Sequence, residues 1–521
     1  MNQPRQHVYN CESISPERAV DALRRLGSLQ TGATESFERT YFDSFDWRLF
    51  DAGKALAVSR GAAGWEIGLI EGESALPALT AAGRLKSGFA SEIQPGELRR
   101  AVEAIIDVRR MLPRLSVSST VLPVALLDRE GKTILRARIE QAVCRRPEGG
   151  SAVPLGLSVI LLPVRGYKKP LRKAQDALTA LAGDAAEAAA SLWIRGLRAV
   201  GRQPGDYSSK LSVRFDATMC AGAASRRLHL SLLDTMERNG DGAVRNLDSE
   251  FLHDFRVAIR RTRSALRQVD KDVLPADIVA ARRADFRWLG RQTNRMRDLD
   301  VYLIAFPGYR AGLPGEYRPA LDPFHDHLVK QSRSEGRRIA ALIKGARYRE
   351  IRDRWRRYLI ETAPRPEDGE NAMLPVRDLA SARISKLHRR MVKAGWAIDD
   401  SSPAEALHNL RIVGKELRYL LEFFSSLYPE HVLTELVRAL KKLQTVLGDF
   451  QDSEIQSLAI RDFARELAEA EPVPVETQMA MGMVADTILR RRAAARGAFH
   501  HRLARFASPE VSANFRFLFE A

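Results

Sequence analysis

The sequence predicts a multidomain protein, with an N-terminal α+β domain followed by an all-α domain. Short segments of alternating hydrophobicity, separated by glycine and other turn residues, fill residues 1–200. Residues 210–510 instead carry apolar residues at helical spacing almost throughout, and one motif occurs there twice. Between them, residues 201–209 are rich in turn-forming residues and lack periodicity, so we place a linker there.

The N-terminal domain is predicted to be an antiparallel sheet with flanking helices. Segments that alternate in hydrophobicity and are joined by short glycine-containing turns form hairpins, and hairpin strands are antiparallel. Two hairpins, one further strand and three helices are expected. They are the hairpins 56–60 with 65–70 and 120–128 with 133–140, the strand 155–164, and helices from residue 16 onward, over 96–110 and over 173–200.

The C-terminal domain is organised around a motif that returns after 155 residues. A histidine is followed by basic residues three, seven and ten positions later, and in the first copy by another after fourteen. On a helix these offsets fall within an arc of roughly 80°, so each copy forms one cationic face. A solvated surface gives no physical reason to repeat such a spacing, which favours a shared binding site. Its candidate residues are His253, Arg256, Arg260, Arg263 and Arg267 in the first copy and His408, Arg411, Lys415 and Arg418 in the second.

The sequence after each motif repeats as well. Asp298 follows the first histidine by 45 residues, and Asp452 follows the second by 44. A stretch rich in proline and glycine, residues 361–370, interrupts the helical pattern between them. The domain is therefore predicted to consist of two similar halves, at about residues 210–360 and 377–510.

Four ordered segments carry a family resemblance. They are LHDFRVAIRRTRSALR, RWLGRQTNRMRDLDVYL, LHNLRIVGKELRYLLEFF and LKKLQTVLGDFQDSE. Residues 210–510 thereby resemble the CHAD family, histidine-containing α-helical domains that bind inorganic polyphosphate. The resemblance implies two helical bundles related by a pseudo-twofold axis, with basic helices lining a shared cavity. It makes inorganic polyphosphate the expected partner of the nine residues above.

The N-terminal domain is similar to the CYTH family of triphosphate tunnel enzymes, which often precedes a CHAD domain. The similarity rests on residues 41–44 and 53–56. The family's metal-binding Glu-x-Glu-x-Lys motif should fall on Gln6, Val8 and Asn10, or on His7, Tyr9 and Cys11, and neither register contains an acid or a lysine. We therefore expect a degenerate CYTH-like barrel without catalytic residues. We interpret its remaining polar residues, Arg136, Arg138 and Glu140, as the ordinary polar face of a strand.

Composition limits the partners further. The chain of 521 residues has a formal net charge of +17, which favours polyanions or anionic membrane surfaces. No apolar run approaches the roughly 20 residues of a membrane span, and three widely separated cysteines fit a reducing cytosol. The histidine pairs 325/327 and 500/501 lack the spacing of metal ligands on one helical face. We expect a cytoplasmic protein, with polyphosphate granules as a candidate location, that needs no metal and no cofactor.

Three alternatives to simple polyphosphate binding stay open. The first is an active CYTH-type triphosphatase that uses the helical domain to bind substrate, against which the missing acids argue. The second is nucleic-acid binding, but only Tyr419 borders either basic arc, and single-strand binders interleave aromatic residues with cations for base stacking. The third is a scaffold that tethers other proteins to polyphosphate granules. The oligomeric state is left open.

Overall fold

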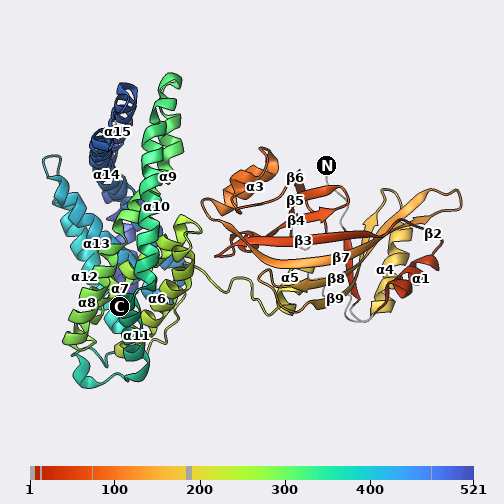
Figure 1. Cartoon of the computed structure of the whole chain (residues 1–521). Coiled ribbons are helices and arrows are strands. Elements are labelled where there is room, and N and C mark those ends of the chain that lie inside the picture. Colours follow the sequence, from red (N-terminus) through yellow and green to blue (C-terminus); the bar gives the residue numbers. More distant parts are fainter. Residues whose placement is uncertain (1–5, 12–13, 73, 183–190, 471, 521) are drawn as a thin grey trace. The chain divides into compact units, whose positions relative to one another are not determined.

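The computed structural model describes residues 6–11, 14–72, 74–182, 191–470 and 472–520. The chain divides into two compact units, Met1–Ser209 and Lys210–Ala521 (Figure 1). The first unit contains all the strands among the described residues, and the second is helical. Each unit has at least one hydrophobic core of its own.

The N-terminal unit is built on an antiparallel sheet, which confirms the predicted α+β class. Across the described residues, its strand order runs from β1 to β6, with β2 (Ser28–Thr31) added beside β7. No ladder joins the two ends of this order within that part of the chain. The order is β1 (His7–Cys11), β9 (Val153–Pro163), β8 (Thr133–Arg145), β7 (Met111–Leu127), β3 (Glu35–Ser44), β4 (Lys54–Gly61), β5 (Gly64–Glu71) and β6 (Leu79–Ala82).

Helices cover the sheet because its strands present apolar residues on both faces. On β9, Leu157, Val159 and Leu161 pack in one core with residues of α1 and α4. The intervening residues Ser158 and Ile160 line a cavity beside α5. The predicted helix over residues 173–200 is represented by α4 and α5, and residues 183–190 lie outside the described part. The helices are α1 (Pro16–Arg24), α2 (Arg48–Asp51), α3 (Glu97–Ile106), α4 (Lys168–Ala182) and α5 (Leu192–Ala199).

The C-terminal unit consists of helices joined by short turns. The motif-bearing helix α7 begins where the carboxylate of Asp248 accepts hydrogen bonds from two backbone amides of the first turn. Its apolar residues Phe255, Ile259 and Leu266 are buried, as their spacing predicts. The helices are α6 (Ala221–Val244), α7 (Ser249–Gln268), α8 (Ala276–Gln292), α9 (Asn294–Ala311), α10 (Asp322–Lys344), α11 (Ala346–Glu361), α12 (Val376–Trp396), α13 (Ala404–Phe423), α14 (Glu430–Ala470), α15 (Val475–Phe506) and α16 (Pro509–Phe519).

One long helix in the second half corresponds to two helices in the first. Leu289 and Asp298 each recur 154 positions later, so α14 spans the equivalents of both α8 and α9. The first half breaks at Thr293, whose hydroxyl contacts the Leu289 carbonyl at 3.1 Å and accepts from Arg256 at 2.6 Å. Such local bonding competes with the regular helix. The equivalent residue, Leu447, is buried and apolar, and the helix continues there.

The two halves of the helical unit share a hydrophobic core. Residues of α9 and α10 pack there with residues of α14 and α15, the long helices that lie together in Figure 1. Phe463 of α14 lies at the centre, with its ring 5.2 Å from that of Tyr302 and 5.6 Å from that of Phe324. Among the described residues, no helix combines the length and apolar content that crossing a bilayer requires.

Candidate functional site

Helices α7 and α13 contact one another and bring the two copies of the motif together. Arg261 of α7 pairs with Glu422 of α13 at 2.8 Å, near the middle of α7 and the end of α13. At the end of α7, Gln268 donates to Glu416 at 2.8 Å, and Arg267 forms an ion pair with the same carboxylate. Later residues of α7 thus meet earlier residues of α13, so the two helices run antiparallel.

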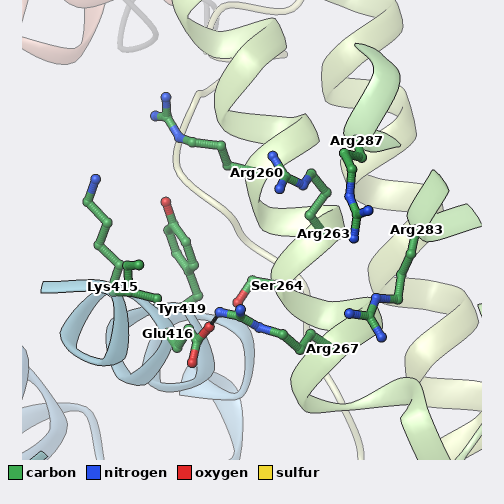
Figure 2. A pocket seen from close by; sticks show the side chains of 10 residues that line it. Arg260, Arg263, Ser264, Arg267, Arg283, Arg287, Lys415, Glu416 and Tyr419 are labelled. Atoms are coloured by element: carbon green, nitrogen blue, oxygen red, sulfur yellow. Dashed lines mark ion pairs between the residues drawn. The ribbon is translucent and has the colours of Figure 1, made fainter. Parts of the chain in front are cut away.

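A basic pocket of about 320 Å³ lies between α7, α8 and α13. Of the described residues that line it, six are cationic and one, Glu416, is a carboxylate. Figure 2 shows Arg267 of α7 reaching across toward Glu416 of α13. The cations are Arg260, Arg263 and Arg267 from α7, Arg283 and Arg287 from α8, and Lys415 from α13.

Burial and mutual repulsion disfavour the charged forms of the basic side chains that line this pocket. Burial, followed by repulsion from Arg411 and Arg260, lowers the pKa of Lys415 to about 8. Burial and neighbouring arginines of α8 likewise lower the pKa of Arg263. A bound anion would supply the missing negative charge, so the pocket has the electrostatics of an anion-binding site.

Four of the nine predicted residues line this pocket, namely Arg260, Arg263, Arg267 and Lys415. The other five, all in the described part of the chain, are not among its lining residues. Arg418 lies beside it, with its guanidinium 5.5 Å from the centre of the Tyr419 ring and 3.5 Å from Glu422. His253, Arg256, His408 and Arg411 belong to the second and third turns of α7 and α13. Because the helices are antiparallel, these turns lie at opposite ends of their contact.

The cations of these turns, Arg256 and Arg411, bind residues of the same half. Arg256 donates to the Gly290 carbonyl at 3.2 Å, the Thr293 hydroxyl at 2.6 Å and the Asn294 side chain at 2.9 Å. Burial lowers its pKa to about 10, and Asp298 opposes that shift. These contacts anchor α7 to the break between α8 and α9.

The corresponding turn of α13 is anchored to α14. His408 Nδ1 lies 2.9 Å from the Gln451 side-chain oxygen, and Arg411 pairs with Asp452 at 2.8 Å. The repeated downstream aspartates, Asp298 and Asp452, thus act on equivalent arginines of the two motifs. In these turns, the repeated spacing serves helix packing as well as charge.

The arginines of α8 are site residues that the repeated motif did not indicate. Arg283 and Arg287 line the pocket, and Arg291 is close enough to lower the pKa of Arg263. Their spacing of four residues places them on one helical face, and this signal was present in the sequence. At the equivalent positions of α14, 154 residues later, stand Val437, Lys441 and Thr445. The first half therefore contributes more charge to the site.

A second pocket, of about 600 Å³, adjoins the first. Arg267, Ile412 and Glu416 line both pockets. Beyond these shared residues, the second pocket has one further cation among its described lining, Arg390 of α12, together with Gln268, Asn409 and Val413. Repulsion from Arg390 also lowers the pKa of Arg267, after burial and the larger repulsion of Arg283 and Arg263.

The N-terminal unit encloses a small cavity, of about 30 Å³, beside its sheet. Val8 and Asn10, which in one register stand where the CYTH motif has its second glutamate and its lysine, line this cavity. Among the described lining residues the one acid is Glu140, which is buried and paired with Arg39 at 3.0 Å. No cluster of three or more His, Cys, Asp or Glu residues suited to a metal ion occurs in the described part. The small volume of the cavity and its single, paired acid therefore fit neither a triphosphate nor a metal ion.

Glu140 differs from the surface strand residue that the sequence suggested. It is buried, although Arg136 on the same strand is exposed. Arg138 is partly buried, with its guanidinium 5.7 Å from the centre of the Phe37 ring. The partner of Glu140, Arg39, comes from β3, which does not neighbour β8 in the sheet. The two side chains therefore meet across the concave side of the sheet rather than along a ladder.

Comparison with known proteins identifies the helical unit. Residues 228–461 match the model of the CHAD domain, so the chain contains a CHAD domain. This confirms the resemblance predicted for the C-terminal part, whereas the CYTH resemblance of the N-terminal unit stays a prediction.

Solved structures similar to this chain include the CHAD domain from the plant Ricinus communis, with 25% identity and a TM-score of 0.47 over 56% of this chain and 94% of that one. PptA from Streptomyces chartreusis is 16% identical, with a TM-score of 0.41 over 54% of this chain and 98% of that one. A protein from Pyrococcus horikoshii is 11% identical, with a TM-score of 0.20 over 34% and 88%. No curated protein matches the chain significantly.

Proposed function

We propose that this protein binds inorganic polyphosphate in the basic pocket between α7, α8 and α13. The observation that carries the proposal is the convergence of six cationic side chains from three helices on one pocket, with one carboxylate among its described lining. A phosphate chain presents about one negative charge per unit and no base to recognise. Dense positive charge with little aromatic surface matches that chemistry.

The residue types also suit phosphate. Arginine offers planar pairs of donors that stay charged, and five of the six cations are arginines. Lys415 adds a compact charge on the opposite helix. Phosphate oxygens would replace the repulsion among these side chains with attraction, so binding would stabilise the helical unit. A bound polyanion is therefore expected to raise its melting temperature.

We further infer a pseudo-twofold relation between the two halves, as the CHAD resemblance implies. Two ion pairs support it. With the 155-residue offset between the two copies of the motif, Glu416 stands at the position equivalent to Arg261, and Glu422 at the position equivalent to Arg267. The pair Arg261–Glu422 is therefore converted into the pair Arg267–Glu416 when the halves are exchanged, and both pairs are formed.

A salt-titrated comparison of polyphosphate with single-stranded DNA tests the proposal. We expect tight polyphosphate binding that weakens steeply with salt, because binding releases counterions. DNA should bind much more weakly at equal charge, since Tyr419 is the one aromatic residue among the described pocket lining and is buried. Equal affinity for both polymers would contradict a polyphosphate site and favour general polyanion binding.

We propose no triphosphatase activity for the N-terminal unit, because its cavity offers one paired carboxylate and little space. A protein that binds polyphosphate without cleaving it would be retained where the polymer accumulates. We therefore propose cytoplasmic polyphosphate granules as its location, either as a ligand of the polymer or as a scaffold for other proteins. Imaging the tagged protein in cells with and without polyphosphate tests this proposal.

A further inference from the structure

The two pockets beside α7 and α13 meet at one ion pair. Arg267 and Glu416 line both pockets and form that pair between α7 and α13 (Figure 2). One side has the α7 and α8 arginines, and the other has Arg390 of α12. The pair therefore stands between two cationic compartments that would otherwise be continuous.

The carboxylate of this pair is held in place. Glu416 is 4% exposed and accepts a hydrogen bond from Gln268 at 2.8 Å, in addition to its pairing with Arg267. The arginine is freer, because 47% of its side chain is exposed. Arg267 can therefore exchange its carboxylate partner for another anion, whereas Glu416 stays fixed and repels any anion that passes.

We propose that the Arg267–Glu416 pair is a clasp that sets which polyphosphate chains the site prefers, an inference that rests on the proposed function. A short chain fills the first pocket and leaves the clasp closed. A long chain must displace Glu416 from Arg267 to continue toward Arg390. The clasp thus disfavours long chains, and opening it joins the two pockets into one binding groove.

The second interhelical pair provides a matched control. Arg261 and Glu422 join the same two helices at 2.8 Å, and both side chains are largely shielded. Neither residue is among the described residues lining the two pockets. Glu422→Gln therefore removes the same charge and the same kind of interhelical contact as Glu416→Gln, without touching the passage.

The experiment measures binding of tripolyphosphate and of long-chain polyphosphate to the full-length protein and to both variants by calorimetry. Glu416→Gln keeps the side-chain shape and an oxygen for Gln268. It should tighten long-chain binding by about tenfold or more, the scale of one charge-assisted hydrogen bond. Tripolyphosphate binding should tighten by less than about threefold, and Glu422→Gln should leave both ligands within that range.

A second substitution, added to Glu416→Gln, tests the far compartment. Arg390 is exposed, so Arg390→Ala should fold normally. It should weaken long-chain binding several-fold in the Glu416→Gln background and leave tripolyphosphate binding unchanged. Equal effects on both ligands would overturn the two-compartment arrangement.

The outcomes separate the two proposals. Wild-type protein that binds neither ligand overturns the proposed function, and with it the clasp. Wild-type protein that binds, while Glu416→Gln and Glu422→Gln respond alike, overturns the clasp alone, because net charge then accounts for the change. Selective tightening of long chains by Glu416→Gln supports both.

Discussion

Replacing three arginines of the pocket by alanine should nearly abolish polyphosphate binding. The triple variant Arg260→Ala, Arg263→Ala and Arg287→Ala removes two cations from α7 and one from α8. A hydrogen bond to a charged group contributes about 1.5–3 kcal/mol, so removing three such bonds at the lower bound costs roughly 4.5 kcal/mol of binding free energy. Because about 1.4 kcal/mol is a tenfold change, affinity should fall roughly a thousandfold.

The variant should fold, because the apolar face of α7 is untouched. Its unliganded form should melt at a higher temperature than the wild type. The lowered pKa of Arg263 means that the folded state disfavours the charged form, and at neutral pH this penalty is fully present. Removing the charge removes the penalty. Differential scanning calorimetry of the free proteins measures this effect.

Binding should be measured by isothermal titration calorimetry at several salt concentrations. The logarithmic salt slope should become shallower by about 2, at about 0.7 for each phosphate that is no longer neutralised on a single-stranded polyanion. The control is a triple alanine variant on α11, outside the described pocket lining, at Arg352, Arg354 and Arg357. It makes the same change in net charge. An equal fall in affinity for both triples would refute the idea of a specific pocket.

Four further outcomes are expected. The pKa of Lys415 in the unliganded protein is about 8, so polyphosphate binding above that pH should take up protons and weaken as pH rises. Calorimetry in buffers of different ionisation heat detects this proton uptake, and Lys415→Met should remove it. Arg256→Ala should change affinity far less than Arg260→Ala in parallel titrations, because the Arg256 guanidinium is engaged by Gly290, Thr293 and Asn294. Tripolyphosphate incubated with the protein and Mg²⁺ or Mn²⁺ should release no phosphate above a control lacking the N-terminal unit. Gly242→Ala should lower the free energy of unfolding by about 1–3 kcal/mol in urea titrations, because its methyl group would lie 2.1 Å from the Phe251 ring.

The repeated motif predicted both basic helices, because helical spacing is a local property of the chain. It did not predict which cations meet. A helix of 20 residues is about 30 Å long, so an arc of cations cannot face one small pocket along its whole length. The antiparallel contact selects Arg260 and the residues after it. This selection, and the contribution of Arg283 and Arg287, depends on helix packing that a single-helix pattern does not encode.

The N-terminal hairpins were predictable for a similar reason. Glycine-containing turns and alternating residues act between near neighbours, and β4 pairs with β5 as expected. The meeting of Arg39 with Glu140 joins residues far apart in the chain, from strands that are not neighbours in the sheet. Sequence periodicity assigned Glu140 to a polar strand face, but only the curvature of the sheet turns that face inward.

The exchanged ion pairs also determine which halves can associate. If two copies of the first half met through α7, as α7 meets α13, Arg261 would face Arg267 of the other copy. Two copies of the second half would place Glu416 against Glu422. Like charges would therefore repel one another in a homodimer of either half, whereas the mixed complex forms both ion pairs. Separately expressed halves should reassemble into the mixed complex and not into homodimers.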